Sequence, residues 1–95
     1  MQQLSKRLTA VAAMVSSGSR LADIGTDHAY VPIRLVQEGR IPGALAMDVK
    51  DGPLARAREH IREQGLEQYI QTRKSDGLVA LQPGEADTVL MAGMG

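Results

Sequence analysis

Short strand-like segments alternate with helix-like segments along the whole of this sequence. The strand-like segments cover residues 20–24, 44–47, 69–74 and 88–91, and the first, second and last of them are mostly apolar. Continuous apolar strands are typical of parallel sheets, because helices cover such sheets on both faces. The alternation therefore predicts an α/β fold with about four parallel strands.

The segments before and between these strands carry helix signals. Residues 4–15 place their apolar side chains on one helical face, and residues 16–19 end that helix. Residues 29–37 form the second predicted helix, in whose first turn Pro32 is tolerated. A third helix is expected from Asp51, as its N-cap, to Gly65, which closes it. One short helical turn is expected at residues 78–81.

Composition narrows the classes of function. The chain has 95 residues, enough for one small domain, and its 11 basic and 11 acidic residues cancel. It therefore lacks the basic field of a typical nucleic-acid-binding domain, and with Tyr30 and Tyr69 as its aromatic residues it lacks a stacking platform for single strands. The absence of cysteine excludes disulfides and thiolate metal sites. No apolar run approaches the roughly 20 residues that span a bilayer, so we expect a cytoplasmic protein with no metal site and no membrane partner.

Acids or glycine-rich turns follow all four predicted strands. In an open parallel sheet, ligands bind beyond the carboxyl ends of the strands, where the strand order reverses. The segments at these ends are Gly25-Thr26-Asp27-His28, Asp48, Asp76-Gly77 and Ala92-Gly93-Met94-Gly95. This repeated placement predicts a ligand site at one edge of the sheet.

Each position suits a particular contact. Gly25 allows a sharp turn and close approach of the backbone to a ligand. Asp48 follows Gly25 by 23 residues, near the spacing of about 20 residues at which an acid accepts hydrogen bonds from a ribose. Asp76 is placed to receive the amine of an adenine, and Asp23 to pair with an ammonium group. As the alternative, Asp48 and Asp76 could each be a helix or turn cap with no ligand.

The loop after the first strand distinguishes two nucleotide cofactors. A dinucleotide site requires the pattern G-x-G-x-x-G, so that a pyrophosphate can approach bare backbone. Here Gly25 is present, but Asp27 occupies the position of the next glycine, and its charge would repel a pyrophosphate. S-adenosyl-L-methionine carries a sulfonium and an ammonium group and no phosphate. Asp23 and Asp27 therefore favour this cofactor over NAD, which remains the alternative.

Four segments resemble one enzyme family over the whole chain. They are residues 22–33 (ADIGTDHAYVPI), 47–54 (MDVKDGPL), 75–78 (SDGL) and 92–95 (AGMG), and residues 4–8 (LSKRL) also fit. The sequence resembles the bacterial tRNA adenine-N1-methyltransferases that modify an adenine of the D-arm region. The segment ADIGTDHAY is more specific than the general methyltransferase glycine loop.

The resemblance implies a class I Rossmann-like methyltransferase fold, here a truncated three-layer sandwich that binds S-adenosyl-L-methionine. It implies that Asp48 lies at the ribose of the cofactor and Asp76-Gly77 at its adenine, and that Val49 also contacts the cofactor. The residues implied at the methionine and sulfonium end are Asp23, Gly25, Thr26, Asp27 and His28. Ala92 and Gly93 would also contact the cofactor, and the loop 92–95 would lie beside the target base. The implied catalytic residues are Asp23, Asp27, Gly93 and Met94.

The resemblance also implies tRNA as the partner of the full-length protein, with N1 of an adenine as methyl acceptor. Members of the family continue past the AGMG loop with further strands and a C-terminal helical domain. Residues 1–95 are therefore expected to form the N-terminal, cofactor-binding part of the family's Rossmann-like domain.

Several features also have purely structural interpretations. A basic group formed by Arg56, Arg58, Arg62, Arg73 and Lys74 is expected to be a solvated face paired with Glu59 and Glu63. His60 is expected to be solvated, and His28 to support the loop or the cofactor. An alternative to catalysis is a non-catalytic fragment that self-associates through an exposed edge strand at residues 88–91.

Overall fold

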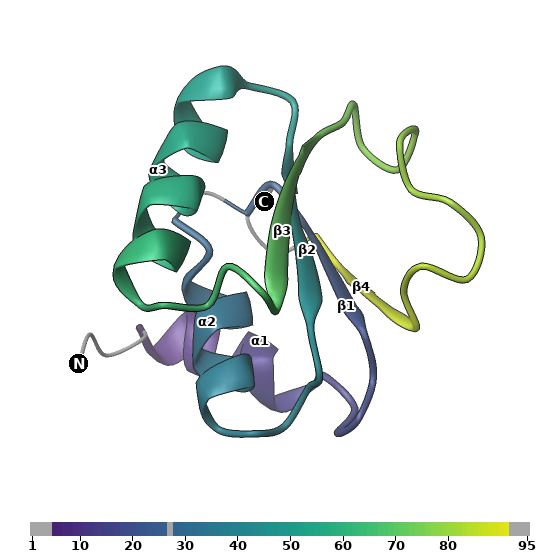
Figure 1. Ribbon diagram of the computed structural model, residues 1–95. Coiled ribbons are helices and arrows are strands. Elements are labelled where there is room, and N and C mark those ends of the chain that lie inside the picture. Colours follow the sequence, from purple (N-terminus) through teal and green to yellow (C-terminus); the bar gives the residue numbers. More distant parts are fainter. Residues whose placement is uncertain (1–4, 27, 92–95) are drawn as a thin grey trace.

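The computed structural model describes residues 5–26 and 28–91. Within them, helices and strands alternate in the predicted order, as the ribbon in Figure 1 shows. The helices are α1 (Lys6–Ala13), α2 (Tyr30–Gln37) and α3 (Asp51–Glu63). The strands are β1 (Leu21–Ile24), β2 (Ala44–Asp48), β3 (Ile70–Lys74) and β4 (Thr88–Leu90).

The four strands form one parallel sheet in the order β3-β2-β1-β4. Leu21 of β1 pairs with Ala44 of β2 on one side and with Thr88 of β4 on the other. The chain therefore builds the sheet outward from β1 to β3 and then crosses to the opposite side of β1. The predicted α/β fold is confirmed, and its strand order reverses at β1, where such sheets bind ligands.

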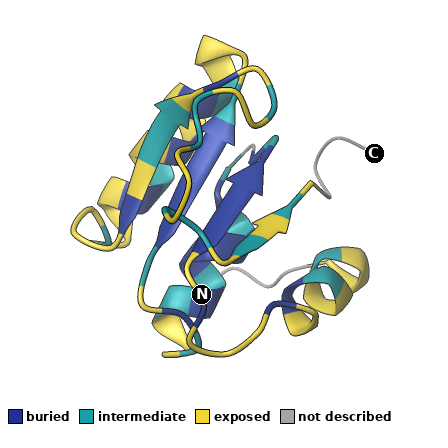
Figure 2. Ribbon diagram, turned by 90° about the vertical axis from the view of Figure 1, so that its right-hand side faces the viewer, coloured by how far each residue is buried: buried dark blue, intermediate teal, exposed yellow. Residues whose placement is uncertain are grey.

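All three helices pack on the same face of the sheet, which we call the helix-covered face (Figure 1). The side chains of Leu21, Ala44, Ala46 and Ile70 point to this face, because side chains alternate along a strand. Buried side chains of α2, among them Val31 and Leu35, pack over them. Figure 2 shows the central strands as buried and the short outer strand β4 as partly exposed.

An irregular segment, residues 75–87, covers the opposite face, which we call the loop-covered face (Figure 1). Ala80, Leu81 and Ala86 of this segment pack against apolar side chains of β1 and β2. Where one helical turn is expected at residues 78–81, the structure has turns at residues 77–80, in which the Leu81 amide donates to the Leu78 carbonyl at 3.0 Å, and no longer helix. The Ser75 hydroxyl competes with helical bonding by donating to the Gly77 carbonyl and accepting from the Ala80 amide.

Local contacts explain where the helices begin. Helix α1 begins after Ser5, whose hydroxyl accepts a hydrogen bond from the Leu8 amide at 3.1 Å. The prediction that Asp51 caps α3 is wrong: Lys50 is the N-cap residue, and Asp51 is the first residue of the helix. The Asp51 carboxylate lies 3.2 Å from the Lys74 ammonium group instead.

Strand β4 is an edge strand of the described sheet, with Val89 and Met91 about half-exposed. This is the edge through which self-association was predicted, and self-association stays a prediction. Among the described residues, no helix combines the length and the apolar character needed to cross a membrane.

Candidate functional site

The turn after β1 folds over the end of β2. Gly25 adopts a φ of 71°, a left-handed conformation that glycine tolerates best. The amides of Gly25 and Thr26 both donate to the Met47 carbonyl, at 2.8 and 3.0 Å. Two neighbouring strand ends are thereby joined through the glycine that the sequence singled out.

Asp23 is a buried acid near the carboxyl end of β1, with 6% of its surface exposed. The hydroxyl of Thr26 donates to its carboxylate at 2.9 Å. Burial raises the pKa of Asp23 to about 7; the Thr26 hydrogen bond opposes this shift and the charge of Asp48 adds to it. The ionised carboxylate is therefore costly here, and a cation beside it would favour ionisation.

The end of β2 presents a half-buried acid and an exposed apolar side chain. The backbone amide of Lys50 donates to the Asp48 carboxylate at 3.0 Å, which orients the carboxyl group. Val49 is 50% exposed although it is apolar. An exposed apolar residue beside an oriented acid is typical of the wall of a small-molecule site.

The end of β3 is tied to the end of β2 by a hydrogen bond from the Ser75 amide to the Asp48 carbonyl, at 2.9 Å. Asp76, the next residue, is exposed. Gly77 has a φ of 60°, and the position of a Cβ atom on it would meet nothing within 4 Å. Gly77 therefore borders open space beside Asp76.

These three strand ends line an open cavity of about 470 Å³. This volume lies within the range of about 300–1,000 Å³ that is usual for small-molecule sites. The residues that line it are Ile24, Gly25, Asp48, Val49, Lys50, Pro53, Arg56, Ser75, Asp76 and Gly77.

The structure sorts the residues predicted for the site into three groups. Gly25, Asp48, Val49, Asp76 and Gly77 line the cavity together. Asp23, Thr26 and His28 do not line it, and the first two are buried. Asp27, Ala92, Gly93 and Met94 lie outside the described residues.

Five lining residues were not predicted as site residues, namely Ile24, Lys50, Pro53, Arg56 and Ser75. Lys50 and Pro53 belong to the family-like segment 47–54, which leads into α3, and Ser75 immediately precedes the predicted Asp76. Their adjacency to the predicted acids was the signal that could have identified them. Arg56 reaches the cavity from one helical turn further along α3, which only the packing of that helix reveals.

His28, Tyr30 and His60 form a cluster of rings next to the turn after β1. The rings of His28 and Tyr30 stack at 4.9 Å, and the Tyr30 and His60 rings meet edge to face at 5.2 Å. His60 Nδ1 lies 2.8 Å from the His28 carbonyl oxygen. The expectation that His60 is merely solvated is wrong, because α3 turns it toward this loop.

The basic group expected on the surface is largely paired, but only in part with the predicted partners. Arg62 contacts Glu59, as expected. Arg73 instead makes two contacts with Glu85, at 2.6 and 2.8 Å, and donates to the Ala80 carbonyl. This bidentate pair lowers the pKa of Glu85 to about 2.

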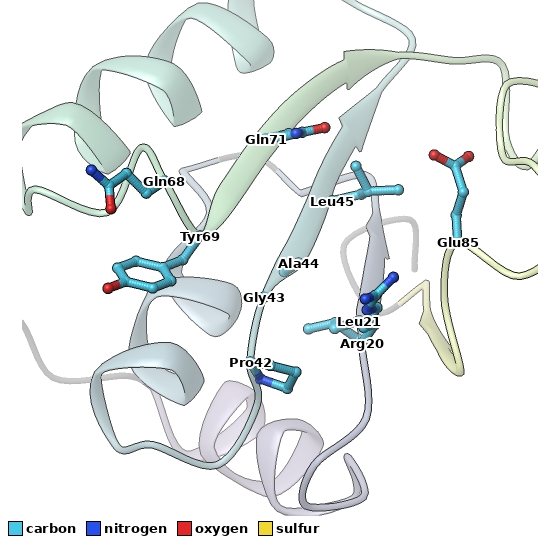
Figure 3. A pocket seen from close by; sticks show the side chains of 10 residues that line it. All are labelled: Arg20, Leu21, Pro42, Gly43, Ala44, Leu45, Gln68, Tyr69, Gln71 and Glu85. Carbon is cyan, nitrogen blue, oxygen red and sulfur yellow. The ribbon is translucent and has the colours of Figure 1, made fainter.

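A second cavity of about 430 Å³ lies at the amino ends of the strands. Figure 3 shows its wall, in which Gln71 and Leu45 extend from the strands and Glu85 faces Leu45 from the irregular segment. Open parallel sheets bind ligands at the opposite, carboxyl edge. The candidate site is therefore the 470 Å³ cavity, where acids and glycines converge.

Comparison with known proteins also indicates a methyltransferase. A family model described as "Methyltransferase domain" matches residues 4–95. The tRNA (adenine(22)-N(1))-methyltransferase of Bacillus subtilis (strain 168) is 43% identical over 93 residues, which are 98% of this chain and 39% of that protein. The resemblance noted from the sequence segments is thereby confirmed.

Two solved structures are similar over most of the chain. A Streptococcus pneumoniae protein in complex with S-adenosyl-L-methionine has a TM-score of 0.92 and 42% identity, over 98% of this chain and 44% of that one. TrmK of M. capricolum, in complex with S-adenosyl-homocysteine, has a TM-score of 0.82 and 40% identity, over 88% and 37%.

The chain thus spans about two fifths of the length of each of these proteins. The match to the family model covers nearly every residue, and the TM-score of 0.92 shows that the fold is shared. This chain belongs to the methyltransferase-domain family.

Proposed function

We propose that the chain binds S-adenosyl-L-methionine at the carboxyl edge of its sheet, as the cofactor-binding part of a tRNA (adenine-N1)-methyltransferase. The observation that carries the proposal is the 470 Å³ cavity in which the ends of β1, β2 and β3 meet. Support comes from the relatives: one is solved in complex with S-adenosyl-L-methionine, and another is named for N1 methylation of a tRNA adenine.

The residues of the cavity fit the parts of this cofactor. Asp48 is oriented by the Lys50 amide and leaves the end of β2 toward the cavity, where it would accept hydrogen bonds from ribose hydroxyls. Asp76 would receive the adenine amine, and Gly77 leaves room for the ring beside it. Val49 and Pro53 supply apolar surface. Lys50 and Arg56 balance the two acids, so NAD is retained as a competing ligand in the test below.

The proposed chemistry needs no general base. The cofactor supplies a methyl group bound to a positively charged sulfur. The N1 lone pair of a neutral adenine forms the new carbon–nitrogen bond as the carbon–sulfur bond breaks, and the positive charge moves onto the purine. The protein must then hold the base in line and accommodate that charge. We assign this to Asp23 together with Asp27, Gly93 and Met94.

Calorimetric titration of the chain tests the proposal. We expect S-adenosyl-homocysteine and S-adenosyl-L-methionine to bind more tightly than NAD. Asp48→Ala should weaken binding by about 10- to 100-fold, because hydrogen bonds to a charged group are lost. Asp51→Ala is the matched control, since Asp51 is an exposed acid three residues away that does not line the cavity. Equal affinity of wild type and Asp48→Ala would refute the ribose assignment, and tighter binding of NAD would refute the choice of cofactor.

A further inference from the structure

The turn after β1 ends in a strained residue. Ala29 has a φ of 60° and is the sole non-glycine residue with positive φ in the described part of the chain. Its side chain is fully buried. The left-handed conformation is unfavourable for alanine, because Cβ crowds the following carbonyl. Such a residue persists where its surroundings restrain it, so this turn requires restraints.

Two restraints come from the turn and α2 themselves. The Ala29 amide donates to the Thr26 carbonyl at 3.2 Å, and the Ala29 carbonyl accepts from the Ile33 amide at 3.0 Å. These bonds close the turn and begin α2. They involve neighbours in the sequence and do not fix the turn relative to the rest of the protein.

A third restraint comes from α3. His60 Nδ1 lies 2.8 Å from the carbonyl oxygen of His28, which is 32 residues away in the sequence. Because a carbonyl oxygen can only accept, Nδ1 must carry the proton and donate it. The His60 ring also packs against Tyr30, the first residue of α2. His60 thus holds the residues on both sides of Ala29.

We infer that His60 is a positioning residue: it holds the end of the turn, at His28 and Ala29, and the hydrogen bond from the Ala29 amide to the Thr26 carbonyl links this end to Gly25 at the cavity. The inference rests on the proposed function, since it concerns the same cavity. Helix α3 contributes Pro53 and Arg56 to the cavity wall near its beginning and His60 to the turn near its end. One rigid helix therefore sets two walls of the cavity relative to each other, although His60 does not line it.

Two substitutions separate the hydrogen bond from the ring. His60→Phe keeps a ring against Tyr30 but removes the donor. His60→Asn removes the ring but places an amide nitrogen near the position of Nδ1. The control is Arg58→Ala, which breaks another hydrogen bond of α3, to the Thr72 hydroxyl of β3, away from the turn. For each variant, hydrogen exchange of the Ala29 and Ile33 amides is followed without ligand, and S-adenosyl-homocysteine affinity is measured by calorimetry.

We expect His60→Phe to speed exchange at both amides and to weaken S-adenosyl-homocysteine binding by about 2- to 10-fold, the range set by one hydrogen bond. His60→Asn should restore both properties, and Arg58→Ala should change neither. The inference would be overturned if amide exchange in His60→Phe were unchanged. It would also be overturned if His60→Asn did not restore slow exchange and S-adenosyl-homocysteine affinity. Failure of the wild-type chain to bind the ligand would overturn the proposed function instead, and exchange alone would then decide whether His60 holds the turn.

Discussion

The two faces of the sheet shift the pKa of a carboxyl group in opposite directions. Asp23 points to the helix-covered face, and burial raises its pKa to about 7. Glu85 lies on the loop-covered face, where the Arg73 guanidinium lowers its pKa to about 2. The same chemical group is therefore costly to ionise on one face and readily ionised on the other.

The difference arises from what covers each face. Three helices exclude water from one face with a continuous apolar cluster that includes Val31 and Leu35. The other face is covered by residues 75–87, an irregular segment held by polar contacts such as those of Arg73 and Ser75. The helix-covered face stabilises the fold, and the loop-covered face holds a segment whose first residues, among them Asp76, line the candidate site.

The largest expected effect on the free energy of unfolding tests this difference between the two faces. Leu35 is fully buried on the helix-covered face, so Leu35→Ala should lower the free energy of unfolding by about 3–5 kcal/mol. Leu81 is half-buried on the loop-covered face, and Leu81→Ala should cost only about 1 kcal/mol, since less surface is lost from a packed environment. Urea denaturation followed by circular dichroism measures both values.

Equal losses of unfolding free energy in Leu35→Ala and Leu81→Ala would contradict this difference between the faces. They would show that the irregular segment packs as tightly as the helices. Val79→Ala serves as a control. Val79 is in the same segment and 82% exposed, so it should leave the free energy of unfolding nearly unchanged.

The next effect concerns the buried carboxyl group. Folded Asp23 binds its proton more tightly than the unfolded chain does, so the free energy of unfolding should fall as pH rises from about 4 to about 7. Asp23→Asn removes this dependence and keeps an acceptor for Thr26. The variant should match wild type near pH 4 and exceed it above pH 7, by up to about 4 kcal/mol. Urea denaturation at several pH values measures the difference.

Ligand binding provides a second measurement of the ionisation of Asp23. If the carboxylate pairs with the ammonium group of the cofactor, binding of S-adenosyl-homocysteine should tighten as pH rises through 7 in wild type but not in Asp23→Asn. Parallel stability curves for the two proteins between pH 4 and 8 would contradict the raised pKa.

The sequence predicted the features of the helix-covered face best. The periodicity of the apolar residues placed every helix and strand within a few residues of its observed bounds. The site was also found in outline, because acids and glycines at strand ends are local signals. Gly25, Asp48 and Asp76 could be chosen from the end of one strand at a time, and the parallel sheet then brought them together.

Contacts between distant residues were not predictable in this way. His60 meets the His28 carbonyl only because α3 crosses the turn after β1, and nothing in the residues around His60 indicates that crossing. Arg73 pairs with Glu85 across the irregular segment, whereas periodicity suggested partners on α3. One helical turn was predicted at residues 78–81, and the structure has turns at residues 77–80, where the Ser75 hydroxyl bonds the Gly77 carbonyl and the Ala80 amide.

The smallest expected effect lies on the loop-covered face. The folded pKa of Glu85 is depressed, so the contribution of its pair with Arg73 should be present above about pH 4.5 and be lost as pH falls toward 2. Glu85→Gln should therefore lower the melting temperature slightly at pH 7, and this difference should vanish near pH 2.

Partial exposure of both side chains keeps the effect small, so thermal unfolding needs a matched control. Glu63→Gln is this control, because it removes an exposed glutamate of α3 and thus the same formal charge as Glu85→Gln. Limited proteolysis should in addition cut residues 75–87 faster in Glu85→Gln than in Glu63→Gln, since the irregular segment has no helix to hold it. If Glu85→Gln and Glu63→Gln melt at the same temperature and are cut at the same rate, the pair of Arg73 with Glu85 does not hold residues 75–87 on the sheet. The apolar contacts of this segment alone must then hold it.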